Sequence, residues 1–408
     1  MEASSPKKLT RWPILLIGVL SMMFAGIIYA WSILKAPLSD TFGWNASELA
    51  LNFTLTMCLF CIGCFIGGWL AKRVSPKITI GLAGLLAGGG FVLTAYFSAS
   101  SIVVLYFTYA VMGGLGIGLA YNVILSTVSA WYPDRKGFCS GCLMMGFGAS
   151  PLILGNLAGT MFDNPGIGWQ TTYVVLGIAL CVVLVATGFL IKRPGADVTL
   201  PEPKQNKANN SELFERRDFT PGQMLKRFTF WRAFLCLICL TAVGNTVISF
   251  ARDLAISVGA VDTLATTLVG VLSVCNGLGR ISTGALFDAL GRKKTMITAN
   301  AVTILAAGVT LLAVLIGNLP LCIIGLCLTG LSYGACPTVA SAFTSAFYGQ
   351  KNFSTNFSIM NFNLMGASFM ATACSQMLIA TGGYWAPYVL LLSLSLMALA
   401  LNFSIRRP

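Results

Sequence analysis

The sequence has no histidine and few charges: charged residues make up 10% of its 408 positions, and aspartate and glutamate together number only 13. The missing histidine excludes a serine–histidine triad, a histidine metal site and a histidine proton relay. A soluble protein has about 25% charged residues, so this chain cannot cover a water-exposed surface of its size. No phosphate-binding loop of the form G-x-x-x-x-G-K-[ST] occurs either, which argues against the use of ATP.

Hydrophobic residues are what the sequence has in excess, at 56% of the chain. They fall in twelve runs of about 20 residues or more, the length that a helix needs to cross a hydrocarbon core of about 30 Å. Helices are expected because an open strand edge leaves backbone groups unpaired in lipid. The sequence therefore predicts an all-α membrane protein with twelve transmembrane helices in a lipid bilayer. The runs are residues 12–35, 48–71, 78–98, 102–131, 137–161, 172–191, 231–250, 263–287, 297–316, 319–347, 353–379 and 384–403.

Lysine and arginine indicate how the chain is oriented. Twelve crossings place both ends on one side, and on that side fall all of the 26 lysines and arginines except Lys35, Arg252 and Arg280. Cytoplasmic loops carry the excess of lysine and arginine, so we expect a multi-pass protein of the cell inner membrane with both termini cytoplasmic. This topology also accounts for the net charge of +13 without a nucleic-acid partner.

One long polar segment, residues 193–228, divides the chain. It contains prolines and mixed charges, which is typical of a linker. We expect an N-terminal six-helix bundle at residues 1–192, a cytoplasmic linker at 193–228 and a C-terminal six-helix bundle at 229–408. A faint repeat supports the two halves, since similar segments begin at Gly68 and Gly284, after the second helix of each half. Two six-helix halves in parallel repeat predict a transporter.

The second of these segments carries a family motif. Its sequence is Gly284-Ala-Leu-Phe-Asp288-Ala-Leu-Gly291-Arg292-Lys293, which resembles the loop motif G-x-x-x-D-x-x-G-R-[KR] of the major facilitator superfamily. The resemblance implies the major facilitator fold, and it implies that Asp288 and Arg292 belong to a charge network that gates one state of the transport cycle. The matching segment of the first half has Lys72 where the acid belongs, so we expect such a latch only in the second half.

A narrower resemblance covers nearly the whole chain. It rests on Trp131-Tyr-Pro-Asp-Arg135-Lys136-Gly137, Gly141, Tyr29-Ala-Trp31, Pro37, Tyr121 and Asn276-Gly-Leu-Gly279-Arg280. These residues are similar to signatures of the monocarboxylate transporters and the related oxalate/formate exchangers. The resemblance implies a secondary transporter of a small monocarboxylate such as lactate, not an enzyme, with no cofactor and with a proton as a second partner.

Arg280 is the strongest single candidate for a substrate-binding residue. It lies eight residues before Asp288, about 12 Å deeper in the membrane at 1.5 Å per residue, which is near the midplane. An arginine at that depth costs about 2.5–3.5 kcal/mol to insert, and no acidic residue falls at a midplane position to pair with it. A guanidinium matches a carboxylate with two hydrogen bonds. We therefore expect Arg280 to bind a carboxylate; an arginine tied to helix carbonyls or to a buried acid is the alternative.

Other candidates follow from their position relative to Arg280 or from the resemblance. Asn276 lies four residues before Arg280 on the same helix face, so it can contact the same anion or bond across helices instead. The resemblance implies that Tyr121 and Tyr333, at matching depths in the fourth helix of each half, line the substrate cavity. Weaker candidates, for which packing is the alternative, are Tyr29, Asn361 and Asn363.

The eleventh run contains no lysine or arginine. Oxalate-exchanging relatives carry a lysine in this helix, and the matching stretch Ser358-Ile-Met360-Asn361-Phe362 has no cation. A second carboxylate would enter the cavity without a charged partner, which is costly in a low dielectric. We therefore expect a monocarboxylate rather than oxalate.

Three charged residues are expected at the outer side of the membrane. Lys35 ends the first run and could attract anions or contact the substrate; a lysine that reaches to the membrane interface is the alternative. Arg252 and Asp253 end the seventh helix and could form an exterior gate or a proton site; an ordinary exposed pair is the alternative.

The sequence is compatible with more than one way of driving transport. None of the 13 acids lies at a midplane position, so a proton could travel with the substrate's carboxyl group or use a gate residue such as Asp253. The alternatives to a proton symporter are an organic-anion exchanger of the oxalate/formate type, a redox enzyme that uses cysteine pairs, and an anion sensor. Cysteines with metal-ligand spacing, such as Cys58, Cys61 and Cys64, fall inside apolar runs, where cysteine packs as a small residue, so we expect neither a metal nor a cofactor.

Overall fold

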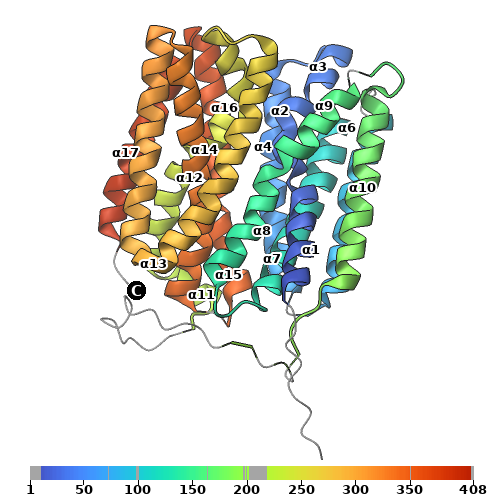
Figure 1. The fold of residues 1–408 in the computed structure, drawn as a ribbon, viewed down its shortest axis with the longest axis vertical. Helices are drawn as coiled ribbons and strands as arrows, with labels where there is room; N and C mark the ends of the chain where they lie inside the picture. Colours follow the sequence, from blue (N-terminus) through green and yellow to red (C-terminus); the bar gives the residue numbers. More distant parts are fainter. Residues whose placement is uncertain are drawn as a thin grey trace, which may run out of the picture.

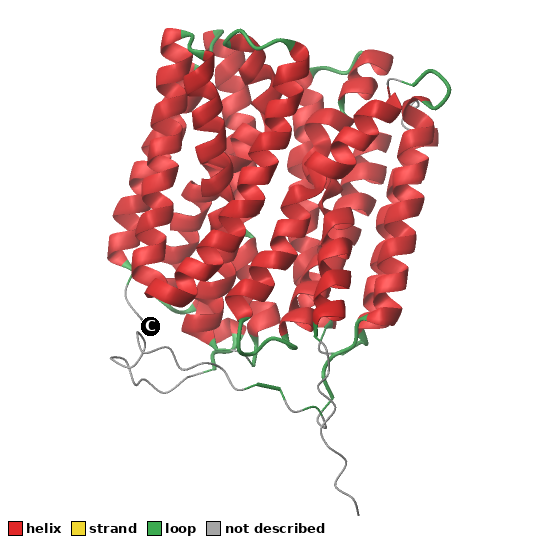
Figure 2. Cartoon of the chain, viewed as in Figure 1, coloured by secondary structure: helices red, strands yellow, loops and turns green. Residues whose placement is uncertain are grey.

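The computed structural model describes residues 11–71, 73–97, 101–162, 164–195, 198, 200–201, 218–349 and 351–405. Every regular element in these ranges is a helix (Figure 2). Twelve helical spans within them are long and apolar enough to cross a membrane. The prediction of an all-α membrane protein with twelve transmembrane helices is therefore confirmed.

The first half of the chain contributes six spans. Three of these spans contain a segment of 3₁₀ or π helix within the α-helix. The first span has a 3₁₀ segment, η1, and the fourth and fifth have π-helical segments, η3 and η4. Pro151 opens η4, where its missing N–H interrupts the regular hydrogen-bond ladder. The elements are α1 (Trp12–Ala25), η1 (Gly26–Ala30), α2 (Trp31–Leu34), α3 (Ala36–Phe42), α4 (Ala46–Leu70), α5 (Pro76–Phe97), α6 (Ile102–Leu105), η3 (Tyr106–Gly114), α7 (Leu115–Ser129), α8 (Lys136–Ser150), η4 (Pro151–Gly155), α9 (Asn156–Phe162) and α10 (Gly168–Leu190).

The second half contributes the other six spans, two of which are joined in one long element. α13 holds the eighth and ninth spans, and its backbone departs from helical geometry at Gly291, where φ is 73° and ψ is 178°. Only glycine adopts this region readily, so Gly291 of the family motif lets the chain turn there. The elements are α11 (Pro221–Leu225), α12 (Phe228–Ser257), α13 (Asp262–Ile316), α14 (Leu319–Tyr348), α15 (Phe353–Asn361), α16 (Asn363–Thr381) and α17 (Trp385–Ser404).

The seventh span is longer than the apolar run that predicts it. α12 kinks at Phe250, where φ is −135° and ψ is 17°, and then continues to Ser257. Arg252 and Asp253 lie in the last turns of this helix, as expected of residues that end it. A pair of exposed charges at the end of a span does not stop the backbone ladder, so hydrophobicity alone places the helix end too early.

Polar residues at helix ends mark where several spans begin and stop. Asn45 and Glu48 form a reciprocal cap at the start of α4: each backbone N–H donates to the other residue's side chain at 2.9 Å. Asn318 caps α14 by accepting from the N–H of Leu321. These caps satisfy N–H groups that have no partner within the helix.

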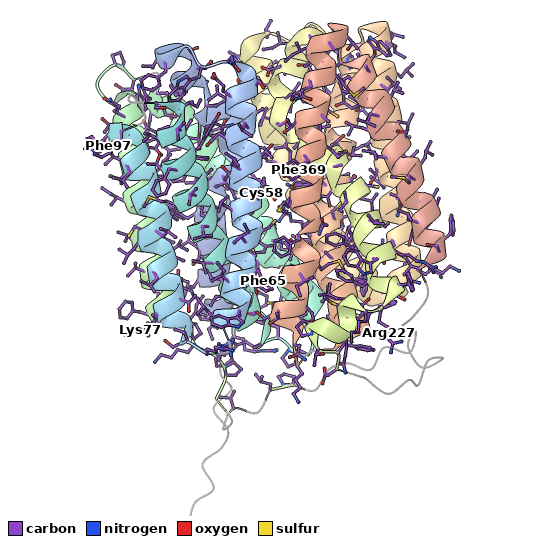
Figure 3. The ribbon with its side chains drawn as sticks, turned by 180° about the vertical axis from the view of Figure 1, so that it is seen from behind. Cys58, Phe65, Lys77, Phe97, Arg227 and Phe369 are labelled. Carbon is purple, nitrogen blue, oxygen red and sulfur yellow. The ribbon has the colours of Figure 1, made fainter. Side chains whose placement is uncertain are left out.

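The two sets of six spans lie side by side, one coloured blue to green and the other yellow to red (Figure 1). Along the seam between them α8 packs on α13, and α4 packs on α15 and α16. Figure 3 shows the second contact from behind, with Cys58 and Phe65 of α4 beside Phe369 of α16. Large apolar side chains such as Leu82 and Leu315 are exposed on the outer surface, as expected where a surface meets lipid.

We name the two ends of the molecule by the helices that begin or end there. α1 begins, α10 ends and α11 lies at one end, which we call the linker end; the opposite end is the far end (Figure 1). The division into residues 1–192, 193–228 and 229–408 stays a prediction.

Candidate functional site

A small closed cavity lies between the two halves. The space open to the centres of water molecules is about 20 Å³, which is room for about one water molecule. A larger organic acid therefore needs the halves to separate before it can enter. The lining residues are Tyr29, Phe60, Tyr121 and Phe147 from the first half, and Thr241, Arg280, Tyr333, Pro337, Asn361, Asn363 and Leu364 from the second.

Arg280 is the charged group of this cavity, and its side chain is almost fully buried, with 1% exposed. Its Nε donates to Oδ1 of Asn276, one turn earlier in α13, at 3.0 Å. Its Nη1 donates to the carbonyl oxygen of Met144 at 2.7 Å, and its Nη2 has no hydrogen-bond partner. No carboxylate among the described residues forms an ion pair with it. The guanidinium therefore keeps an unused N–H face.

Two residues of α8 that sequence reasoning missed contact this guanidinium. Met144 supplies the carbonyl oxygen, and Gly148 lies next to the guanidinium. A Cβ on Gly148 would stand 3.2 Å from Nε of Arg280 and 3.5 Å from Cγ of Asn276. Gly141 of the family signature lies seven residues before Gly148, hence on the same helix face, and it also approaches the backbone of Arg280. That spacing is the one signal in the sequence that could have indicated the contact.

Three predicted tyrosines meet at the cavity. The hydroxyl groups of Tyr29 and Tyr333 are hydrogen-bonded at 3.0 Å, which joins the first half to the second. Tyr29 also interacts electrostatically with Arg280. Tyr121 packs edge-on against Phe60 and Phe147, with ring centroids 5.2 Å apart in both pairs. The arrangement combines an aromatic wall with hydroxyl groups next to a cation.

Asn361 and Asn363 form a second polar side of the cavity together with Thr241, which sequence reasoning missed. The Thr241 hydroxyl donates to Oδ1 of Asn363 at 3.0 Å, and Nδ2 of Asn363 donates to the carbonyl oxygen of Met360 at 2.6 Å. Asn361 is held only by a long contact from its Nδ2 to Sγ of Cys64, at 3.7 Å. Both asparagines flank the break between α15 and α16, which turns both toward the cavity.

A second small cavity lies on the far-end side of Tyr29. Asn276 and Gly148 line it on one side, and Ser273 is its other polar residue. Apolar side chains of α12 and α13 supply much of the remaining surface. The residues that line it are Tyr29, Gly148, Pro151, Ile248, Ala251, Val269, Leu272, Ser273 and Asn276.

The predicted outer charges gather near one another but not in the central cavity. Asp253 and Arg252 both act electrostatically on Lys35, so these residues of the two halves are neighbours. Arg252 and Asp253 approach within 3.9 Å, and their side chains are 36% and 52% exposed. Lys35 therefore does not line the cavity that holds Arg280.

Hydrogen bonds join the two halves on the linker-end side of the cavity, and sequence reasoning missed them. Asn122 of α7 donates to Oγ of Ser358 at 2.5 Å and accepts from Oγ of Ser354 at 3.2 Å. The same two serines also donate to backbone carbonyls of α4, at Gly68 and Cys64. Nothing in the periodicity of either helix marks these serines as partners of the other half.

Toward the far end, a side-chain hydrogen bond joins the second and eleventh spans. The hydroxyl groups of Thr54 in α4 and Thr372 in α16 lie 2.9 Å apart. With the bonds of Asn122, this contact ties the halves together on both sides of the cavity.

The predicted gate at the family motif is described only in part. The side chain of Asp288 lies outside the described residues. Arg292 donates to the carbonyl oxygen of Ile405 at 3.5 Å and stacks over the ring of Phe347, 5.3 Å from its centroid. These contacts tie the motif to the ends of α14 and α17.

The signature between the fourth and fifth spans holds an ion pair that sequence reasoning did not single out. Nη1 of Arg11 donates to Oδ1 of Asp134 at 2.6 Å and to the carbonyl oxygen of Trp131 at 2.9 Å. The guanidinium beside it lowers the pKa of the Asp134 carboxyl. The indole of Trp131 donates to the carbonyl oxygen of Lys192. The signature therefore fastens the start of α1 and the end of α10 together at the linker end.

The chain is similar in sequence to several membrane transporters. The chain is 27% identical over 356 residues to the uncharacterized MFS-type transporter YhjX of Escherichia coli, a match that covers 86% of this chain and 84% of that protein. It is 26% identical over 287 residues to the oxalate:formate antiporter of Oxalobacter formigenes, covering 70% and 65%. It is 24% identical over 392 residues to human monocarboxylate transporter 12, covering 88% and 73%.

Solved structures show the same fold. A bacterial homolog of the human lysosomal transporter Spinster superposes with a TM-score of 0.67 at 17% identity, covering 98% of this chain and 97% of that one. The proton:xylose symporter XylE superposes with a TM-score of 0.73 at 14% identity, covering 97% and 96%. At these identities the likeness concerns the fold alone.

Family profiles agree with the fold and with the relatives. Residues 207–406 match the description Sugar (and other) transporter. Residues 14–251, more than half of the chain, match the description Major Facilitator Superfamily. The expected resemblance to this superfamily, and within it to monocarboxylate and oxalate/formate carriers, is confirmed, and these relatives are transporters and not enzymes. The chain belongs to the Major Facilitator Superfamily.

Proposed function

We propose that this chain is a secondary transporter of a small, lactate-like monocarboxylate, which it carries by alternating access of its two halves. The observation that carries the proposal is the guanidinium of Arg280, which is buried between the halves with an unused Nη2 and without an ion-paired carboxylate among the described residues. An incoming carboxylate supplies the missing charge and the missing acceptor at once. Relatives named as an oxalate:formate antiporter and a monocarboxylate transporter support this substrate class.

The charge of the cavity favours a substrate with one carboxylate. Arg280 is the only cation among the residues that line it. One carboxylate neutralises this guanidinium, whereas the second carboxylate of oxalate would have no cation to pair with in a low dielectric. The relevant binding mode uses Nη2 and the remaining proton of Nη1, because Nε already donates to Asn276.

The other predicted residues take supporting roles in this proposal. Asn276 orients the guanidinium, the hydroxyl groups of Tyr29 and Tyr333 border the carboxylate site, and Tyr121 belongs to the aromatic wall. Asn361 contacts the part of the substrate away from Arg280. Residues that act at the entrances are Lys35, Arg252 and Asp253 at the far end, and Asp288 and Arg292 at the linker end.

The proton travels with the substrate in this scheme. The five acids in the part of the chain with described side chains are Asp40, Glu48, Asp134, Asp218 and Asp253, and none of them lines the cavity. A proton that crosses on the substrate's own carboxyl group needs no relay in the protein. Symport then predicts net uptake when the side from which the substrate enters is more acidic than the other side.

An organic-anion exchanger is the second candidate, and one observation favours it. The loaded cavity is neutral, whereas the empty cavity holds an unpaired guanidinium, and moving an unpaired buried charge between two states is costly. An exchanger avoids the empty return step. Counterflow that persists without a pH gradient, together with no net uptake driven by one, would establish exchange.

The proposed setting is the cell inner membrane with the linker end in the cytoplasm. Lysine and arginine concentrate at that end, as at Lys77 and Arg227 in Figure 3. This asymmetry is the pattern that cytoplasmic loops follow.

Uptake of labelled lactate into proteoliposomes tests the proposed function. Arg280→Ala should abolish uptake while the purified protein stays monodisperse. Arg232→Ala is the matched control, since this arginine bonds only to the carbonyl oxygen of Ser404 at the helix ends and should transport normally. Undiminished uptake by folded Arg280→Ala protein would refute the assignment of the site.

A further inference from the structure

A cleft opens at the linker end of the second half, where α11 meets the start of α12. Its volume is about 490 Å³, which is within the range of small-molecule binding sites. None of the described residues that line this cleft also lines the central cavity, so the proposed carboxylate site does not explain it. The lining residues are Asp218, Phe219, Gln223, Lys226 and Arg227.

Phe219 forms a wall of this cleft, and hydrogen bonds hold its backbone in place. Its N–H donates to the carbonyl oxygen of Tyr348, the last residue of α14, at 3.0 Å. Its carbonyl oxygen accepts from Nδ2 of Asn352 at 3.1 Å and from Nδ2 of Asn356 at 3.0 Å. The cleft is therefore formed before a ligand binds, which reduces the entropic cost of binding.

Two adjacent cations also line the cleft. Lys226 and Arg227 are both exposed, and the Arg227 guanidinium lies over the ring of Phe219, 5.7 Å from its centroid. Among the residues that the structure describes, no carboxylate forms an ion pair with either cation. The carboxylate in the lining is that of Asp218, which accepts from the backbone N–H of Lys351 at 3.1 Å. Both cations are therefore available to an anion.

Exposed aromatic rings adjoin these cations. Phe228 follows Arg227 directly and is 80% exposed, and Trp231 is 46% exposed. The indole of Trp231 donates to the carbonyl oxygen of Leu225 at the end of α11, at 2.9 Å. Aromatic rings beside cations are typical of the boundary between hydrocarbon and lipid headgroups, and Figure 3 shows Arg227 at the linker end of the molecule. An anion that reaches this cleft from the membrane is therefore a lipid headgroup.

We propose that this cleft binds the headgroup of an anionic phospholipid with one phosphodiester, such as phosphatidylglycerol. Lys226 and Arg227 hold the phosphate, because ammonium and guanidinium groups both donate to phosphate oxygens. The acyl chains lie against Phe228 and Trp231. This site is separate from the central cavity, and it does not depend on which substrate the chain carries.

The charges of the lining favour this lipid class. The described lining residues include two cations and one carboxylate, and a phosphodiester supplies one negative charge that balances them. Phosphatidylethanolamine brings an ammonium group as well, so its headgroup leaves one positive charge of the lining uncompensated. The side-chain oxygen of Gln223 accepts from the N–H of Thr220 at 2.9 Å, and its amide N–H groups can donate to the glycerol hydroxyls of the headgroup.

Lipid binding to the unmodified protein tests this inference. The purified full-length protein in detergent is titrated with phosphatidylglycerol, phosphatidylethanolamine or phosphatidylcholine, and native mass spectrometry measures how much lipid each sample retains. We expect phosphatidylglycerol to bind about tenfold or more tightly than the other two lipids and to raise the thermal unfolding midpoint. Equal affinities for phosphatidylglycerol and either of the other lipids would overturn the inference.

Inorganic phosphate distinguishes a lipid headgroup from a soluble anion. It offers the same oxygens to Lys226 and Arg227 but has no acyl chain to lie against the exposed rings. At the concentration of the added lipid it should leave the unfolding midpoint unchanged. A rise as large as that with phosphatidylglycerol would show that the cleft takes a soluble phosphate, and it would overturn the assignment to lipid.

A charge-matched pair of double variants locates the site. Lys226→Gln with Arg227→Gln should lower the affinity for phosphatidylglycerol about tenfold, to that for phosphatidylcholine. Lys192→Gln with Arg193→Gln is the control, because it removes the same charge at the linker end from two exposed side chains that do not line the cleft, and it should bind phosphatidylglycerol normally. An equal loss in both proteins would show a general attraction of the basic surface and would overturn the inference. If the first variant does not fold, the ranking of the lipids by unmodified protein decides the case.

Discussion

The guanidinium of Arg280 in α13 donates to the carbonyl oxygen of Met144 in α8 at 2.7 Å, so one hydrogen bond joins the cation of the second half to the backbone of the first. The bond can persist only while these helices stay in contact at this depth. A carboxylate that binds Nη2 neutralises the same guanidinium. Because this side chain also loses its bond to Met144 when the halves separate, the anion can bind the two states with different affinity, and that difference is what shifts a conformational equilibrium.

Gly148 should be needed for this contact. In Gly148→Ala the added methyl group would stand 3.2 Å from Nε and 3.4 Å from Cζ of Arg280, so the guanidinium must shift by a few tenths of an ångström. We expect lactate affinity to fall about tenfold, while stability is kept because alanine favours a helix by about 1 kcal/mol over glycine. Binding by scintillation proximity and the thermal unfolding midpoint would measure the two effects separately.

Gly308→Ala is the matched control for that change. Gly308 also lies inside a membrane helix, and a Cβ there meets nothing within 4 Å. Equal affinities of Gly148→Ala and Gly308→Ala protein would show that the close approach of Gly148 to Arg280 has no part in binding.

Asn122 should hold the linker end of the cavity closed. Asn122→Ala removes its bonds to Ser354 and Ser358, and losing about 1 kcal/mol shifts the population about fivefold toward a state open at that end. Cys64 accepts from Asn122 and Ser358 through its backbone carbonyl, and its buried thiol should then react faster with a polar maleimide added from the linker side. Peptide mass spectrometry would give the rate at this cysteine.

Thr54→Ala provides the opposite control. It removes the bond to Thr372 at the far end of the same seam, so it should favour opening there and should not expose Cys64 to reagent on the linker side. The same labelling rate in both variants would mean that Asn122 does not act as a gate.

The ion pair of Arg11 and Asp134 should stabilise the protein in a pH-dependent way. The guanidinium lowers the pKa of Asp134 in the folded protein below its unfolded value of about 3.9. The contribution is therefore fully present above about pH 4 and is lost as the pH falls through the folded pKa. Thermal unfolding midpoints of unmodified and Asp134→Asn protein should differ by a constant amount from pH 7 to pH 5 and converge below about pH 4. A difference that does not depend on pH would contradict this assignment.

Much of the architecture can be predicted from the sequence, because a bilayer imposes the length and hydrophobicity of each span. The run at residues 263–287 has the same bounds as the span Thr263–Phe287. The depth of Arg280 also follows from its distance to Asp288 along one helix. Such inferences use only local geometry, which the chain fixes within a few residues.

Contacts between distant segments could not be predicted in the same way. Met144 binds Arg280 through a backbone carbonyl, which every residue has, so its residue type carries no signal. Asn122 and Ser358 meet only because α7 and α15 are brought together across the seam, and neither helix has a periodicity that records its partner. The π-helical segments also escape a pattern based on 3.6 residues per turn.

Thermal unfolding in the presence of lactate tests the central claim most directly. A ligand that binds only the folded protein stabilises it by about 2.7 kcal/mol at a hundred times its dissociation constant. We predict that lactate raises the unfolding midpoint of the unmodified protein in a concentration-dependent way and leaves that of Arg280→Ala unchanged. An equal rise in both proteins would contradict the claim that this guanidinium binds the carboxylate.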